Sequence, residues 1–455
     1  MSLPLLNVLI FAFTCWLGLY LIARDRTKPV LVYTGSGLVA YALSLSFNSL
    51  LPLDLDANLT ITLHPLNKTL LFVPALCWFG AAFHLLPEGT LPNSAFRILR
   101  YLVPVMIGSI FLVLRIVSPP IDDSTAVTLR IVFNVLGFIV LALLLLAVGF
   151  VAYRLRRERS RSLGVLLFVL TLFFTLGAGI ILLQSRLIPF NIALLVMGGD
   201  LLFLDFCIAG LDAFGEGETL LPDATYSFIR AMLIALIFGG QVVLASGGQY
   251  SFSMLALFFG VVAAAIASQV FAESIQNGLD RLVFARLPGL RRARADLRTA
   301  ASVLPRADHS LDLRTLPEDE FTRLTRRALS HMSDPGKLTA SPLMRLPMLD
   351  TRVNNGHTLE RATALKLLLT ESIQRLKPPA KGDFGISDEW RFYNVLYFPY
   401  VLGIKLLSYN HSEEVADDAR KVIEWFRTNV PERTLHNWQN AAARLVAQDL
   451  RDQMR

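Results

Sequence analysis

Charged residues are scarce in this chain of 455 residues. Only 17% of the residues are charged, whereas 54% are hydrophobic, and the mean hydropathy is +0.51. A soluble globular protein of this length normally has a larger charged fraction and a less apolar composition. The composition therefore excludes a soluble enzyme and a disordered chain.

Cysteine is also scarce, with three residues in the whole chain. Cys15, Cys77 and Cys207 all lie inside apolar stretches, and their spacing does not suggest a framework of bridges. We expect free thiols that pack as small hydrophobic side chains. A disulfide-stapled secreted domain is thereby excluded.

Long apolar runs dominate the first part of the sequence and do not recur after Ala272. A run of about 20 apolar residues is long enough to cross a hydrocarbon core of about 30 Å. The sequence predicts an all-α protein with a multi-pass transmembrane domain at 1–272, a basic amphipathic connector at 273–309 and a cytoplasmic helical domain at 310–455. We predict about nine spans, with eight as the alternative, at 5–23, 30–50, 69–86, 101–118, 129–153, 163–183, 191–211, 228–246 and 251–272.

The distribution of basic residues predicts the orientation of these spans. With the N-terminus outside, the inner loops carry ten Lys and Arg residues, and the outer loops carry only Lys68 and Arg186. Short loops rich in Lys and Arg stay on the cytoplasmic side. We therefore predict a bacterial inner-membrane protein with a cytoplasmic C-terminus. The first span has no basic segment before it and no cleavage site after it, so we do not expect a removed signal peptide.

The longest external segment, 51–68, alternates Leu and Thr between two prolines. It is predicted to lie at the membrane interface as a strand or a short helix, serving as a connector or as a ligand-sensing surface.

Two carboxylates inside the seventh span are candidate functional groups, because a charge in hydrocarbon is costly. Asp200 and Asp205 are five residues apart, so their directions on a helix differ by about 140°. They are not expected to form a pair. The favoured role is hydrogen bonding between helices, and a transport pathway that uses Asp200 is the alternative.

The connector carries a cluster of four arginines just after the last span, namely Arg291, Arg292, Arg294 and Arg298. Such a cluster is typical of an electrostatic anchor on anionic lipid. The run Leu279-Asp-Arg-Leu-Val-Phe-Ala-Arg286, following many spans, resembles the sensing region and exit helix of bacterial multi-pass sensor histidine kinases. The kinase part of that family is absent, since Met332 follows His331 and no glycine-rich nucleotide-binding run follows.

The cytoplasmic domain is predicted to be helical, with helices from Pro317 to Met332, over 358–376, from Ser387 and over the final 40 or so residues. On the last helix, the core face is predicted from five apolar residues: Leu435, Trp438, Ala442, Leu445 and Val446. The opposite face is an acid-free stripe of six residues: Arg433, Asn437, Asn440, Arg444, Gln448 and Arg451. Arg, Asn and Gln side chains bind base edges and phosphates in a major groove.

The segment 411–453 also resembles the helix-turn-helix of bacterial transcription regulators and sigma-factor region four. The resemblance rests on Ser412-Glu-Glu-Val-Ala416 and on Val430-Pro-Glu-Arg-Thr-Leu435. It implies a recognition helix that begins near Arg433. The first helix is longer here than in that family, and the turn contains no glycine.

Together these features predict a membrane sensor or regulatory protein that is not an enzyme, has no cofactor or metal, and acts as a homodimer. Duplex DNA is favoured over a cytoplasmic protein as the target. The alternatives are a transporter-like protein and a membrane-anchored adaptor or complex subunit.

Overall fold

The structure is a computed structural model of the full chain. It describes residues 2–53, 57–86, 93–117, 123–157, 161–185, 188–216, 220–247, 251–284, 312–353, 358–379, 384–404, 406 and 417–454, together with a few single positions between 287 and 298. The described residues form helices and turns, without a strand, as the all-α prediction requires. The chain divides into two compact units, a membrane unit of residues 1–212 and 224–275, and a helical unit of residues 213–223 and 276–455.

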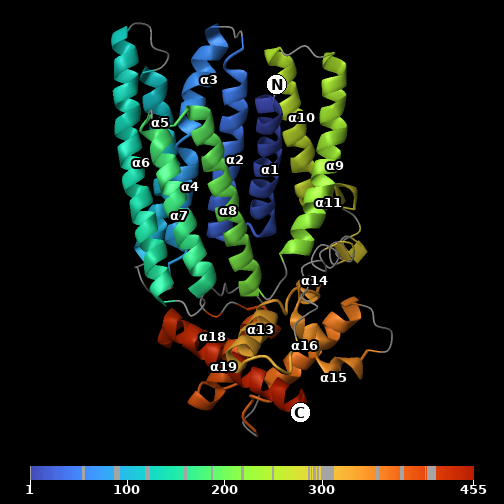
Figure 1. Ribbon diagram of the computed structural model, residues 1–455. Helices are drawn as coiled ribbons and strands as arrows, with labels where there is room; N and C mark the ends of the chain where they lie inside the picture. The colour runs from blue at the N-terminus through green and yellow to red at the C-terminus, as the bar shows by residue number, and fades with distance from the viewer. Residues whose placement is uncertain are drawn as a thin grey trace. The chain divides into compact units, whose positions relative to one another are not determined.

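The membrane unit consists of long apolar helices drawn from blue to yellow-green in Figure 1. Each predicted span coincides with a helix or with part of one. The helices are α1 (Ser2–Arg24), α2 (Pro29–Leu50), α3 (Ala57–Leu70), α4 (Val73–His84), α5 (Asn93–Val117), α6 (Asp123–Arg157), α7 (Arg161–Leu182), α8 (Phe190–Glu216), α9 (Leu221–Ser246) and α10 (Phe252–Val270).

Among the described residues, eight helical segments are long and apolar enough to cross a membrane, and the apolar part of α5, Tyr101–Val117, is shorter. α3 and α4 count as one of the eight, because the apolar segment runs from Leu59 to His84. The segment predicted as a strand or a short helix is thus the helix α3. It contains Pro65, and the chain bends at Leu71 and Phe72 before Pro74 in the first turn of α4. Proline fits that turn because its missing N–H has no partner there.

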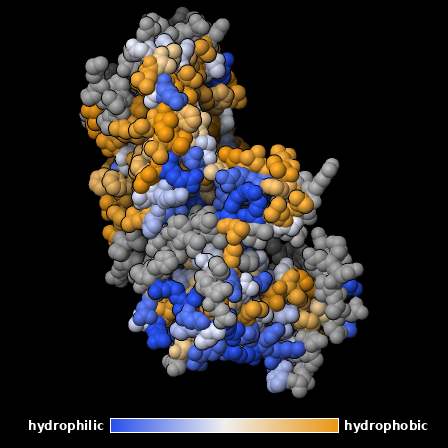
Figure 2. Space-filling view, turned by 90° about the vertical axis from the view of Figure 1, so that its right-hand side faces the viewer, coloured by the Kyte–Doolittle hydropathy of each residue, from blue (hydrophilic) through white to orange (hydrophobic). Residues whose placement is uncertain are grey.

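The outer surface of the membrane unit is apolar, as a lipid-facing surface must be. On α9, the side chains of Leu236 and Leu244 are 74% and 83% exposed. Figure 2 shows orange, apolar side chains over much of the described surface of the membrane helices. The three cysteines are free and buried, as predicted.

The helical unit has a hydrophobic core of its own. Its helices are α11 (Ala272–Val283), whose first turn belongs to the membrane unit, α13 (Glu318–Ser330), α14 (Pro335–Leu338), α15 (Pro347–Asp350), α16 (Thr358–Gln374), α17 (Arg391–Leu396), α18 (Asp417–Asn429) and α19 (Glu432–Met454). Short 3₁₀ helices lie at Pro342–Arg345 and Asp388–Trp390, and a π-helical turn lies at Tyr397–Val401. Phe321, Leu368, Phe398, Phe426 and Val446 are buried in one cluster, which joins α13, α16, the π-helical turn, α18 and α19.

The sequence predicts several of these helices within a few residues. Pro317 precedes α13, whose first turn is acidic, and His331 lies at its C-terminal end. Acidic residues at the start and a histidine at the end suit the helix dipole. The prediction missed α14, a single helical turn that begins at Pro335, because four residues are too few to show a hydrophobic period.

Candidate functional site

The C-terminal helix α19 begins directly after a two-residue turn. α18 ends at Asn429, Val430 is buried, and the carbonyl oxygen of Pro431 accepts hydrogen bonds from Thr434 N and Leu435 N at 2.9 and 3.0 Å. Pro431 lacks an N–H group, which makes it well suited to end one helix and begin the next. The two helices are therefore joined by a short turn, and the helix-turn-helix resemblance remains a prediction. Residues 412–416, the other part of that resemblance, lie outside the described residues.

The core face of α19 is rotated from the predicted one. Leu435, Ala442 and Val446 are buried as predicted, but Leu445 is 37% exposed and the prediction for it is wrong. The buried face extends to the other side, to Ala443, Ala447 and Leu450. The reason is that α13, α16 and α17 all pack on α19, so alanines as well as large residues are covered. Trp438 is half-buried, with its ring edge-on to Phe426 at 6.2 Å.

The polar stripe of α19 divides into two parts. Asn437, Asn440 and Arg444 are exposed, and none of the three has a hydrogen-bond or ion-pair partner among the described residues. We call these three residues the free face of α19. Arg433 lies in the first turn of the helix, and the structure describes only its backbone.

The other two residues of the stripe contact α13 and the turn before it. Arg451 donates a hydrogen bond to the carbonyl oxygen of Leu316 at 2.6 Å, and its guanidinium lies 5.6 Å from the ring centroid of Phe321. Gln448 Nε2 lies 3.5 Å from Glu318 Oε1. Arg451 is half-buried and holds the start of α13, so it is a packing residue within the unit.

The intramembrane carboxylates lie in different surroundings, in agreement with the prediction that they do not pair. Asp205 is 1% exposed, and neither of its oxygens has a hydrogen-bond partner among the described residues. Asp200 is half-buried against α7, where a Cβ atom on Gly177 would lie 3.4 Å from its Oδ2. The interhelical hydrogen bonds expected for Asp205 are thus not found among the described residues.

A cluster at one end of the membrane unit was not predicted from the sequence. Asp212, near the end of α8, accepts a hydrogen bond from Arg24 Nε at 3.1 Å and also pairs with Lys28 in the turn between α1 and α2. Arg24 donates a second hydrogen bond to Tyr20 Oη. The sequence shows Arg24 and Lys28 only as positive loop residues, and their carboxylate partner is 188 and 184 residues away.

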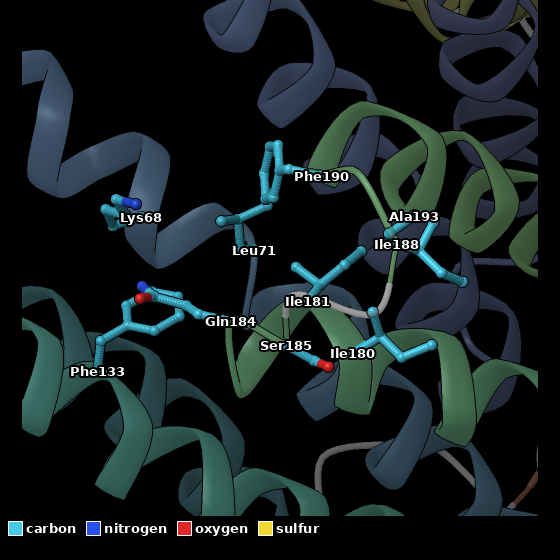
Figure 3. A pocket seen from close by; sticks show the side chains of 10 residues that line it. All are labelled: Lys68, Leu71, Phe133, Ile180, Ile181, Gln184, Ser185, Ile188, Phe190 and Ala193. Carbon is cyan, nitrogen blue, oxygen red and sulfur yellow. The ribbon is translucent and has the colours of Figure 1, made fainter.

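A pocket lies at the end of the membrane unit where α7 ends and α8 begins, and we call it the α7–α8 pocket. Its volume is about 270 Å³, and it is lined by Lys68, Leu71, Phe133, Ile180, Ile181, Gln184, Ser185, Ile188, Phe190 and Ala193. Figure 3 shows Lys68, Gln184 and Phe133 at one end of this space, with isoleucines and Ala193 at the other. The Lys68 ammonium lies 5.3 Å from the ring centroid of Phe133.

The backbone at the edge of this pocket is strained at one residue. Ser185 N donates to Ile180 O at 3.0 Å and Gln184 N donates to Ile181 O at 3.2 Å, which is the Schellman arrangement for ending a helix. The residue at its left-handed position is Gln184, with φ of 47°, where glycine is preferred. A side chain other than glycine costs about 1–2 kcal/mol in that conformation.

Two of the four connector arginines contact an acidic residue of α11. Arg298 lies 2.6 Å and Arg294 lies 3.5 Å from Asp280 Oδ2. The hydrogen bond from Arg298 lowers the pKa of Asp280 below its ordinary range, so the carboxylate stays charged and offsets part of the basic cluster. Arg291 and Arg292 lie outside the described residues, and lipid anchoring by the four arginines remains a prediction.

The described residues contain no group of three or more His, Cys, Asp or Glu side chains that is arranged to hold a metal ion. Comparison with family models, with curated proteins and with solved structures finds no match to the chain.

Proposed function

We propose that this chain is a membrane-anchored regulatory protein whose helical unit binds duplex DNA through the free face of α19. The observation that carries the proposal is that Asn437, Asn440 and Arg444 are aligned, exposed and without partners among the described residues. Polar residues are usual on the outer face of a surface helix, and this face is distinguished by the alignment of its amide and guanidinium groups. Such groups are suited to an external target.

The chemistry of the three side chains suits a major groove. An Asn side chain can bind adenine through two hydrogen bonds, and Arg can bind guanine or a phosphate. At 1.5 Å per residue, the distance along the helix from Asn437 to Arg444 is about 10 Å, close to the groove width of about 12 Å. In helix-turn-helix proteins the N-terminal part of the second helix enters the groove, and here the free face begins in the second turn of α19 and reaches its middle.

The charge of the soluble part predicts weak binding by a single copy. Residues 273–455 carry 28 basic and 23 acidic residues, a net charge of only +5. A homodimer that binds two half-sites would raise the affinity, and anchoring in the membrane would favour pairing by raising the local concentration.

The test is equilibrium binding of the full chain, in nanodiscs of neutral lipid, to a fluorescent duplex of random sequence. Arg444→Ala is expected to weaken binding by about 1–3 kcal/mol if the arginine contacts a base, or to lower the salt slope by about one if it contacts a phosphate. Arg345→Ala, at an exposed arginine of the 3₁₀ helix Pro342–Arg345, changes the net charge equally and is the matched control. Absence of binding at about 50 mM salt, where phosphate contacts are strongest, would contradict DNA binding and favour the protein adaptor.

A second function, proton-coupled transport, is favoured by one observation, the complete burial of Asp205 without a hydrogen-bond partner among the described residues. Buried carboxylates of this kind carry protons in many membrane transporters. In liposomes with an imposed pH gradient, transport would appear as dye-detected proton flux that Asp205→Asn or Asp200→Asn abolishes. Equal flux in the wild type and both variants would exclude it.

A further inference from the structure

The α7–α8 pocket is lined by three polar residues, Lys68, Gln184 and Ser185, and by seven apolar ones. Lys68 is half-buried there, contacts the face of Phe133, and forms no ion pair with any described residue. The ring offsets only part of the cost of placing an ammonium group beside apolar side chains. An anion in the pocket would supply the missing counter-charge.

The polar groups favour a carboxylate over other anions. A single lysine matches a single negative charge, whereas a phosphate monoester brings up to two. The Gln184 amide borders the same space and adds a hydrogen-bond donor. A cationic ligand would be repelled by Lys68, and a neutral one would leave the ammonium without a counter-charge.

The rest of the lining accommodates a hydrocarbon chain. Five of the ten lining residues are aliphatic, namely Leu71, Ile180, Ile181, Ile188 and Ala193, and two more are phenylalanines. The volume of about 270 Å³ lies just below the range of about 300–1,000 Å³ for sites that enclose a drug-sized ligand. It suits the head and first part of one acyl chain, and it is too small for a two-chain phospholipid.

We propose that the α7–α8 pocket is a binding site for a free fatty acid taken from the bilayer, with Lys68 pairing to its carboxylate and Gln184 donating a hydrogen bond. The strained backbone of Gln184 fits this role, because glycine would relieve the strain but would remove the amide from the pocket. The site rests on residues of the membrane unit alone and does not depend on DNA binding.

The experiment measures binding of radiolabelled decanoate to the full chain in phosphatidylcholine nanodiscs, with empty nanodiscs subtracted. Decanol and decyltrimethylammonium serve as neutral and cationic competitors with the same chain. Decanoate is expected to compete at least about tenfold better than either of them, a difference that corresponds to about 1.4 kcal/mol. Equal competition by decanol would overturn the proposal, and so would absence of specific decanoate binding.

Variants then assign the binding to the pocket. Lys68→Met is expected to weaken decanoate binding about tenfold, and Lys68→Arg to retain it within about threefold. Lys28→Met removes a lysine from the turn between α1 and α2 and is the matched control. A Lys68→Met result equal to that of Lys28→Met would overturn the proposal.

If Lys68→Met does not fold, Ala193→Phe provides the second test, because it fills the pocket while Lys68 remains. It is expected to abolish decanoate binding, and unchanged binding would overturn the site. DNA binding by Ala193→Phe is measured in the same preparation. Loss of decanoate binding with unchanged DNA binding would show that the substitution acts on the pocket alone.

Discussion

Arg24 and Asp212 form a buried ion pair that joins α1 to the end of α8. Their atoms Nε and Oδ2 are 3.1 Å apart, and their side chains are only 2% and 13% exposed. Removing Asp212 would take away the carboxylate that compensates the buried Arg24 charge. Lys28, the second partner of Asp212, is 31% exposed and is better solvated.

The two cations that contact Asp212, Arg24 and Lys28, are expected to contribute unequally to the stability of the membrane unit. Arg24→Met is expected to destabilise the membrane unit by about 1–3 kcal/mol, because it removes charged hydrogen bonds to Asp212 and Tyr20 while Lys28 still pairs with Asp212. Lys28→Met is expected to cost at most about 1 kcal/mol, because the Lys28 side chain is partly solvated and Arg24 still pairs with Asp212. Thermal unfolding in nanodiscs measures both, and equal effects would show that Arg24 is not the principal partner of Asp212.

The close contact of α1 and α2 predicts that Gly18 does not tolerate a side chain. A Cβ atom on Gly18 would lie 2.7 Å from the carbonyl oxygen of Gly35, and neither backbone can move without separating the helices. Gly18→Val is expected to destabilise the unit by at least about 1–3 kcal/mol. Gly199→Ala, at a helical glycine with open space around it, is the control and is expected to be neutral or slightly stabilising. A harmless Gly18→Val would contradict the close packing.

The two parts of the α19 stripe predict opposite behaviour for two arginines. Arg451→Ala is expected to destabilise the helical unit by about 1–3 kcal/mol, since it removes a charged hydrogen-bond donor from the Leu316 carbonyl. Arg444→Ala is expected to change stability by no more than about 0.5 kcal/mol and to act on DNA binding instead. Hydrogen exchange of α13 measures the change in stability, and fluorescence anisotropy of the labelled duplex measures the change in DNA binding. Loss of stability in Arg444→Ala would assign that residue to packing.

An ion pair between Arg352, in the turn after α15, and Glu371, on α16, predicts a pH dependence of local stability. The Nη1 and Nη2 atoms of Arg352 each donate to one oxygen of Glu371 at 2.8 Å, and these hydrogen bonds lower the pKa of Glu371 below its ordinary value of 4.5. A carboxyl whose pKa is lower in the folded state stabilises that state above its unfolded pKa, and the contribution is lost as the pH falls through the folded value.

Hydrogen exchange of α16 is therefore expected to be slower in the wild type than in Glu371→Gln at neutral pH. The difference should shrink as the pH falls below 4.5. Arg352→Gln should remove the same pH dependence. A difference that grew on acidification would mean that the pair does not stabilise the folded state.

The predicted orientation is tested by reporter fusions at the two ends of α6. An alkaline-phosphatase fusion after Asp123 is expected to be active and one after Arg161 inactive, because the basic loop between α6 and α7 should remain in the cytoplasm. The reverse result would overturn the orientation.

The presence and approximate positions of the membrane helices could be predicted from the sequence, because a membrane helix satisfies its backbone hydrogen bonds within one segment. Each apolar run therefore predicts a helix without reference to the rest of the chain, and the predicted spans overlap helices from α1 to α10. The full lengths of these helices could not be predicted, since α6, for example, extends to Asp123 and Arg157 beyond the apolar run. The third span begins earlier than predicted, at Leu59, because the polar residues Asn67 and Lys68 and the proline Pro65 do not interrupt the helical segment. The polar stripe on α19 could be predicted for the same reason, since helical period is a local property.

Only the tertiary structure decided which residues are partners. Arg24 contacts Asp212 across 188 residues, and Arg451 contacts Leu316 across 135. Such pairs depend on how the helices are ordered around one another, and the spacing of residues along one chain segment does not contain that information. The same applies to the exposure of Leu445, which follows from the directions in which α13, α16 and α17 cover α19. The α7–α8 pocket is likewise a property of the folded unit, because Lys68, Phe133 and Gln184 come from three separate segments.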